Sequence, residues 1–192
     1  MRHIGAVVDE LAPRVAEAGE GRFAIFGHSM GALVAFELAR RLRALGGPTP
    51  LALLVAGMGA PHCPPSRPPA RHLPDDEFIV AVDRYGGLPA AVLESDELLE
   101  LVLPALRADF EAAETYRYVP GEPLDVPIVA AAGVEDAFVP DGTLEAWADH
   151  TSVGCEARRM PGGHFFLHER PELAEFLAGR LQMLAAATPA VS

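Results

Sequence analysis

The sequence contains little cysteine, little positive charge and no long hydrophobic run. Its two cysteines, Cys63 and Cys155, stand in unlike contexts without metal-ligand spacing, which argues against a disulfide framework and a structural zinc site. The formal net charge of −12 at pH 7 leaves no basic face for nucleic-acid phosphates. The longest apolar runs, such as Leu51 to Gly59, are too short to cross a bilayer, and no secretory leader is recognisable. We therefore expect a cytoplasmic protein without a nucleic-acid, membrane or metal site.

Enough apolar sequence is present for a folded core. The chain has 192 residues, of which 50% are hydrophobic and 22% are charged, as in a globular protein. No internal repeat and no long linker divides it. We therefore expect residues 1–192 to form a single domain.

A strand, a sharp turn and a helix follow one another from Phe23. Phe23 to Phe26 is apolar like a buried strand, the next five residues read Gly-His-Ser-Met-Gly, and a helix continues from Ala32 to Leu45. This is the G-x-S-x-G nucleophile elbow, which exposes the hydroxyl of Ser29 at the carboxyl end of a strand. We expect both glycines of the motif to be required by the tight reversal. The main-chain N–H of Met30, at the helix N-terminus, is the expected oxyanion donor.

Other segments indicate an α/β fold with a mostly parallel sheet of about four strands. Ile4 to Ala18 has helical spacing, although Pro13 is expected to kink it or to move its start. A short helix capped by Asp141 is expected up to Ala148. Three further strands are predicted at Leu51 to Ala56, Ile128 to Ala132 and Cys155 to Met160. A closing helix is predicted from Pro171, with a frayed tail from Ala187.

Residues 61–120 are expected to form a helical lid inserted between two strands. Prolines recur from Pro61 to Pro74 and exclude regular structure there. Helical segments follow at Asp76 to Tyr85 and after the capping residue Ser95, the second with a continuation from Pro104 to about Tyr116. The apolar residues of this region are divided between core packing and an acyl pocket, and the sequence leaves the division open for Phe78, Leu98, Leu101, Leu103, Leu106 and Phe110.

The candidate catalytic residues occur in the order Ser29, Asp136, His164. A serine hydroxyl needs a histidine to take its proton and a carboxylate to orient that histidine. Asp136 and His164 each follow a predicted strand, where open α/β sheets hold their sites. His168 is the nearest rival base but falls in a predicted helix, and Glu135 is the neighbouring acid. The chain order is that of α/β-hydrolases.

At these residues the sequence resembles the type II thioesterases of polyketide and nonribosomal peptide synthesis, which are α/β-hydrolases. The resemblance implies Ser29 as nucleophile, Asp136 as orienting acid and His164 as base. It further implies a substrate acyl group on the phosphopantetheine arm of a carrier domain, and no cofactor of the enzyme's own. The matching stretches are Gly27 to Leu38, Leu103 to Phe110 with Glu114, Tyr116 and Tyr118, Gly133 to Val139 with Trp147, His150 and Thr151, and Pro161 to Leu167.

The family has further strands and a second oxyanion turn ahead of its elbow, whereas Ser29 lies close to Met1 here. We therefore expect an N-terminally truncated α/β-hydrolase fold and a poor catalyst. A general esterase and an inactive carrier-binding protein remain as alternatives. A further hypothesis is that a basic patch near the lid steers acidic carrier domains through Arg67, Arg71, His72 and Arg84.

Overall fold

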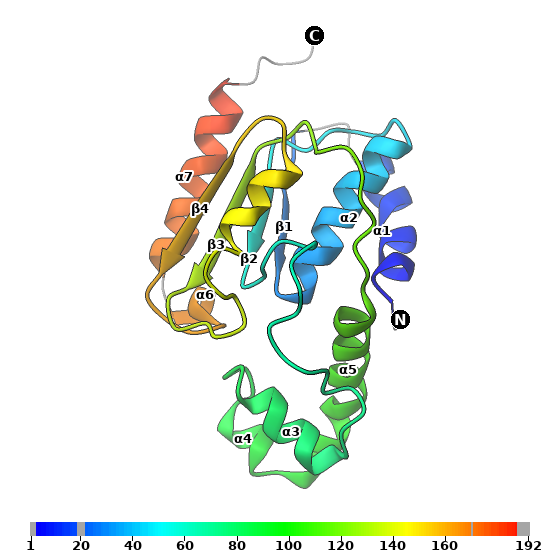
Figure 1. The fold of residues 1–192 in the computed structure, drawn as a ribbon, viewed down its shortest axis with the longest axis vertical. Coiled ribbons are helices and arrows are strands. Elements are labelled where there is room, and N and C mark those ends of the chain that lie inside the picture. The colour runs from blue at the N-terminus through cyan, green and yellow to red at the C-terminus, as the bar shows by residue number, and fades with distance from the viewer. Residues whose placement is uncertain (1–2, 19–21, 170, 188–192) are drawn as a thin grey trace.

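The protein has a parallel sheet in a computed structural model that describes residues 3–18, 22–169 and 171–187. The sheet has four strands in the order β1-β2-β3-β4, and all three pairings are parallel. The expected α/β fold is therefore confirmed (Figure 1). The strands are β1 (Ile25–His28), β2 (Leu53–Ala56), β3 (Ile128–Gly133) and β4 (Cys155–Met160).

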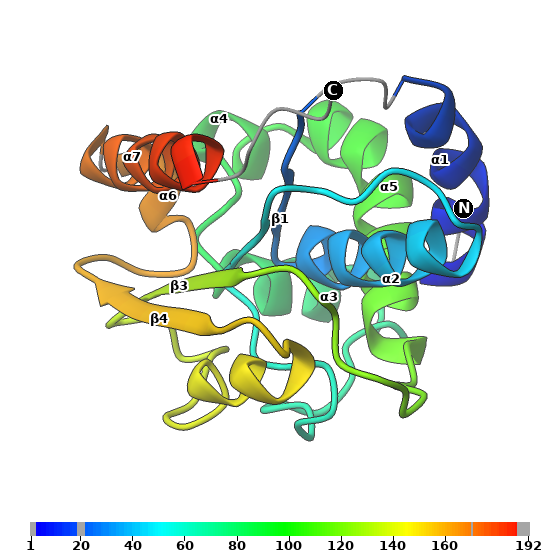
Figure 2. The ribbon, with the colours of Figure 1, turned by 90° about the horizontal axis from the view of Figure 1, so that it is seen from above.

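Helices cover both faces of the sheet (Figure 2). One face packs against α2 (Met30–Ala44) and the 3₁₀ helix η1 (Glu145–His150), and α1 (Ile4–Ala18) packs on α2. The largest apolar cluster lies on this side of the sheet. The other face packs against α6 (Phe166–Glu169) and α7 (Pro171–Ala187), where Phe166 is fully buried. Strands β2 and β3 are buried along their whole length because both of their faces are covered.

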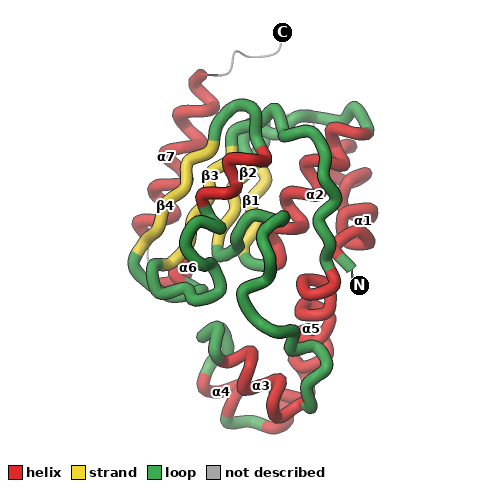
Figure 3. Tube along the Cα trace, viewed as in Figure 1, coloured by secondary structure: helices red, strands yellow, loops and turns green. Residues whose placement is uncertain are grey.

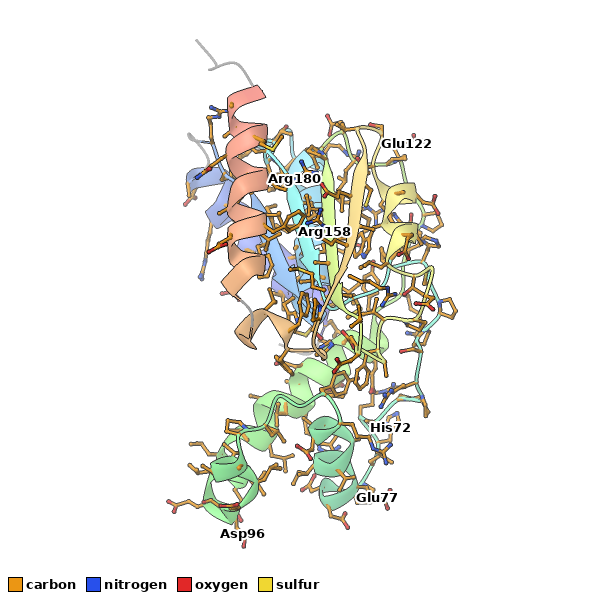
Figure 4. All side chains as sticks on the ribbon, turned by 90° about the vertical axis from the view of Figure 1, so that its left-hand side faces the viewer. His72, Glu77, Asp96, Glu122, Arg158 and Arg180 are labelled. Carbon is orange, nitrogen blue, oxygen red and sulfur yellow. The ribbon has the colours of Figure 1, made fainter. Side chains whose placement is uncertain are left out.

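The outer strand β4 differs from the two buried strands in carrying charge. Glu156 pairs with Arg180 of α7, and the guanidinium of Arg158 lies 4.3 Å from the centre of the Phe176 ring. Figure 4 shows Arg158 and Arg180 between α7 and β4. These contacts hold the closing helix against the edge of the sheet.

Between β2 and β3 the chain leaves the sheet and forms a helical insertion (Figure 3). The insertion consists of α3 (Asp75–Asp83), α4 (Ala90–Leu93) and α5 (Asp96–Thr115), and α4 was not predicted. Ser95 caps α5 as expected, since its side chain accepts a hydrogen bond from the N–H of Leu98 at 3.3 Å. α5 is a single helix that runs through Pro104, in agreement with the expected continuation of the segment capped at Ser95. Phe78 and Val82 are buried in a small core of the insertion.

Several predicted boundaries were wrong by a few residues. β1 extends to His28 and α2 begins at Met30, so Ser29 alone forms the turn. Helix α1 is continuous through Pro13. Asp141 does not cap a helix, because η1 begins four residues later and its N-cap is Leu144. The predicted tail after Ala187 lies outside the described residues. In the described part of the chain, no helix has the length and hydrophobicity needed to cross a membrane.

Candidate active site

Ser29 has a strained backbone at the junction between β1 and α2. Its φ is 53° and its ψ is −124°, and it is the only non-glycine residue with positive φ among the described residues. Such a conformation costs on the order of 1–3 kcal/mol. The N–H of Ser29 donates to the carbonyl oxygen of Ala56 at 2.8 Å, which ties the turn to β2. The adjacent Met30 is the first residue of α2, where main-chain N–H groups have no carbonyl partner within the helix.

The two glycines of the elbow are not equivalent. A Cβ on Gly27 would overlap the carbonyl group of Gly31, because the first turn of α2 folds back onto the end of β1. Gly31 has open space around the position of a Cβ, with nothing within 4 Å. The expectation that both glycines are required by the reversal is therefore wrong for Gly31. Gly27 alone has that role.

The structure brings together the three residues that the sequence analysis singled out. Nδ1 of His164 lies 2.9 Å from Oδ2 of Asp136, and Nε2 of His164 lies 2.9 Å from Oγ of Ser29. An ionised carboxylate only accepts, so Nδ1 carries the proton and Nε2 is left to accept from the Ser29 hydroxyl. Asp136 and His164 are 4% and 5% exposed, so the hydrogen bond between them is shielded from water.

Asp136 and His164 come from loops after β3 and β4 that cross closely. A Cβ on Gly133, at the end of β3, would overlap the carbonyl oxygens of Gly162 and Gly163. The other carboxylate oxygen of Asp136, Oδ1, accepts a hydrogen bond from the N–H of Phe138 at 2.9 Å. Both oxygens of the buried carboxylate are therefore satisfied.

The rival residues lie elsewhere. Glu135 is exposed, whereas its neighbour Asp136 is buried. His168 lies in α6, as the sequence analysis expected. Sequence reasoning missed a role for His28, whose Nε2 lies 2.8 Å from the carbonyl oxygen of His164. The position of His28 inside the elbow, next to Ser29, was the only sequence feature that could have indicated this role.

A cavity of about 450 Å³ opens beside Ser29. Leu106 and Phe110 of the insertion line it, whereas Phe78 is buried in the core of the insertion. Leu98 and Leu101 are 39% and 75% exposed, so these two residues neither plug a core nor line the cavity. The other apolar lining residues include Met30, Leu33, Met58, Val82, Leu88, Tyr116 and Phe165. An apolar cavity of this size is suited to the carbon chain of an acyl group.

Two of the four residues in the hypothetical basic patch are already engaged. The guanidinium of Arg67 lies 3.8 Å from the centre of the Phe138 ring, and Arg71 forms an ion pair with Glu114 at 3.4 Å. Their charges are therefore less available to a partner than the sequence suggested. His72 and Arg84 remain exposed.

No metal or disulfide site was found in the described residues. Cys63 and Cys155 are both free thiols, and burial raises the pKa of Cys155 to about 11. No group of three His, Cys, Asp or Glu side chains within the described residues is arranged to hold a metal ion. The residues around Ser29 are suited to acid–base chemistry on a carbonyl compound.

The sheet is parallel, Ser29 lies on a strained turn between a strand and a helix, and Asp136 and His164 lie on later loops. This arrangement defines an α/β enzyme of the hydrolase type. Residues 1–181 match the thioesterase domain family. The chain therefore belongs to this family, and it is a thioester hydrolase.

Individual relatives and solved structures match most of the chain. The chain is 39% identical over 183 residues to linear gramicidin dehydrogenase LgrE of Brevibacillus parabrevis, covering 93% of this chain and 70% of that protein. It is 44% identical over 168 residues to thioesterase PikA5 of Streptomyces venezuelae, and this match covers 85% of this chain and 59% of PikA5. The solved structure of YbtT, a type II thioesterase from the yersiniabactin NRPS/PKS biosynthetic pathway, has a TM-score of 0.84 and 30% identity, covering 98% of this chain and 76% of YbtT.

Proposed function

We propose that the chain is a serine thioesterase that hydrolyses acyl groups from the phosphopantetheine arms of carrier domains in polyketide or nonribosomal peptide synthesis. The observation that carries the proposal is the chain of hydrogen bonds from Ser29 through His164 to Asp136, with both distances at 2.9 Å. The carrier-bound substrate is supported by the likeness to YbtT, which belongs to an NRPS/PKS pathway.

In the proposed first step, Oγ of Ser29 attacks the thioester carbonyl carbon while Nε2 of His164 takes the hydroxyl proton. The imidazolium is stabilised by the carboxylate of Asp136 at 2.9 Å. The oxyanion faces the N–H of Met30 at the start of α2. The C–S bond then breaks, the sulfur receives the proton from His164, and the acyl group stays on Ser29.

The second step regenerates the enzyme. A water molecule gives a proton to Nε2 of His164 and attacks the acyl–serine carbonyl. The bond from the carbonyl carbon to Oγ breaks, and His164 returns its proton to Ser29. The net reaction consumes one water and yields a carboxylic acid and a free thiol, and it requires no cofactor.

Two measurements test this proposal. The chain and its Ser29→Ala variant are treated with a fluorophosphonate probe, and labelling of the unsubstituted chain alone is expected. Hydrolysis of an acyl-carrier domain is then compared with hydrolysis of a nitrophenyl ester of the same acyl group. A wide preference for the acyl-carrier substrate is expected. Equal rates on the two substrates would indicate a general esterase, and binding of the carrier without labelling or hydrolysis would indicate an inactive carrier-binding protein.

A further inference from the structure

A short turn of the helical insertion lies directly on the candidate catalytic histidine. We call residues 85–87, Tyr85-Gly86-Gly87, the insertion turn; it follows α3. The centre of the Tyr85 ring is 5.0 Å from that of His164, with the ring planes at 73°. The insertion therefore contacts the proposed base itself, in addition to forming a wall of the cavity.

Tyr85 also belongs to a stack that joins three separate segments. Its ring lies on that of Phe138, with centroids 3.4 Å apart and an interplanar angle of 15°. The guanidinium of Arg67, from the proline-rich segment, lies 3.8 Å from the centre of the Phe138 ring. Burial raises the pKa of Tyr85 to about 12, so the phenol stays neutral in this stack. Aromatic pairs and cation–π contacts of this kind stabilise an arrangement beyond the burial of its apolar surface.

Phe138 connects this stack to Asp136. Its N–H donates to Oδ1 of Asp136 at 2.9 Å, while its ring lies 5.5 Å from the ring of His164 at 63°. One residue therefore contacts the carboxylate through its main chain and the imidazole through its side chain. A displacement of Phe138 would therefore change the surroundings of both His164 and Asp136.

The insertion turn also fits closely against the loop that carries His164. A Cβ on Gly87 would overlap the ring of Phe165, the residue that follows the histidine. Phe165 in turn lies 5.2 Å from His164, with their planes at 87°. Tyr85 and Gly87 thus contact the histidine loop at two places, and a side chain at position 87 would require the Phe165 ring to move.

We propose that Tyr85 is a positioning residue for His164. With the insertion turn seated, Tyr85 and Phe138 fix the imidazole in line with Asp136 and Ser29 and keep water from its Nδ1–H. The proposal rests on the proposed function for the role of His164 as base. The insertion would then have two roles. Its Tyr85 holds His164 in place, and its helices provide apolar contacts for an acyl chain.

The test uses an acetyl thioester of N-acetylcysteamine, whose two-carbon acyl group is too short to depend on the apolar side chains of Leu106 and Phe110 deeper in the cavity wall. Tyr85→Ala is expected to lower kcat by roughly tenfold to a hundredfold with little change in KM, since small misplacements of catalytic groups have effects of that order. Tyr85→Phe keeps the ring and is expected to stay within about twofold of the unsubstituted chain. Phe138→Ala should resemble Tyr85→Ala, and the double variant should lose little more than either single variant because the two rings act together.

A spectroscopic measurement separates positioning from a general loss of stability. The proton on Nδ1 of His164 is followed by NMR, and faster exchange with water is expected in Tyr85→Ala but not in Tyr85→Phe. Tyr118→Ala is the matched control, because Tyr118 packs on His150 with ring centroids 5.1 Å apart and does not line the cavity. It is expected to lower stability while leaving the Nδ1 proton and kcat unchanged.

The proposal is overturned if Tyr85→Ala keeps both the short-substrate kcat and the slow exchange of the Nδ1 proton, so that only KM for long acyl chains rises. It is also overturned if Tyr118→Ala lowers kcat to the same extent. The NMR readout requires no turnover. A chain that hydrolyses no thioester would refute the proposed function, while the exchange rates would still decide the role of Tyr85.

Discussion

Nε2 of His28 donates a hydrogen bond to the main-chain carbonyl oxygen of His164 at 2.8 Å, although the two residues are 136 positions apart in the chain. His28 immediately precedes Ser29, so the same dipeptide supplies the candidate nucleophile and a support for the loop of the candidate base. Gly57 makes this possible, because a Cβ there would come within 2.7 Å of Nε2 of His28. The end of β2 is therefore kept free of side chain where the two histidines meet.

The first prediction concerns this support. His28→Ala should lower kcat for thioester hydrolysis roughly tenfold, because the loop carrying His164 loses one hydrogen bond and a small misplacement of a base is costly. The free energy of unfolding should fall by about 1–2 kcal/mol. His28→Gln retains an N–H donor and should recover part of both losses. Unchanged kcat in His28→Ala, measured at saturating substrate, would show that the loop does not depend on this bond.

The second prediction concerns the three candidate catalytic residues. Ser29→Ala and His164→Ala should each lower the rate by about 10⁴ to 10⁶, with Asp136→Asn somewhat milder, because members of a triad act as a unit. Single-turnover hydrolysis of an acyl-carrier substrate provides the rate. Asp136→Asn with turnover within tenfold of the unsubstituted chain would contradict the role of Asp136.

Much of the sheet and the proximity of the three candidate residues followed from sequence pattern. The continuous apolar sequence from Leu51 to Ala56 predicted a strand covered on both faces. β2 and β3 are indeed buried at every position. Ser29, Asp136 and His164 were expected at one edge because parallel strands place their carboxyl ends together. The catalytic roles and the carrier-bound substrate are still predictions.

Other features depended on tertiary contacts that no local pattern contains. The stacking of Tyr85 on Phe138 joins an insertion turn to a loop after β3, and neither segment carries a signal for the other. The two elbow glycines look alike in sequence, and only the return of α2 onto Gly27 distinguishes them. Similarly, Arg67 and Arg71 appeared as free charges until their partners Phe138 and Glu114 were located.

The third prediction compares these glycines directly. Gly27→Ala should abolish activity and lower stability by several kcal/mol or prevent folding, because its methyl group would overlap the carbonyl of Gly31. Gly31→Ala meets open space in the first turn of α2 and should stabilise the chain by up to about 0.5–1 kcal/mol. Denaturant midpoints of the two variants provide the comparison. Equal destabilisation by both substitutions would refute the assignment of the close approach to Gly27 alone.

The fourth prediction is a pH dependence of stability that arises from His150. Burial, with a smaller contribution from the neighbouring His62, lowers the pKa of His150 to about 4. The unfolded imidazole titrates near 6.5. Between these values the unfolded state binds more protons than the folded state, so stability should fall as the pH is lowered. The loss attributable to His150 between pH 7 and pH 5 should be about 2 kcal/mol.

His150→Asn provides the control for this effect. It removes the titrating ring from beside Phe36, Trp147 and His62, and it should lower stability at pH 7 while flattening the decline toward pH 5. Urea unfolding of both chains at several pH values supplies the two slopes. Parallel slopes for the variant and the unsubstituted chain would assign the decline to other groups.

The last prediction concerns the two edges of the sheet. Among the described residues, β1 pairs with β2 alone and β4 pairs with β3 alone. β4 carries Glu156, Arg158 and Arg159, which oppose pairing with a further chain, whereas Ile25–His28 carries no acidic or arginine side chain and Phe26 is 49% exposed. Self-association of the 192-residue chain should therefore proceed through β1.

Phe26→Thr keeps a residue suited to strands but removes the exposed ring, and it should lower the concentration-dependent increase in particle size measured by light scattering. Leu101→Thr makes the same apolar-to-polar change at a 75% exposed position of α5, away from the sheet, and should have little effect. An equal reduction by Leu101→Thr would mean that exposed apolar area in general, and not the β1 edge, drives the association.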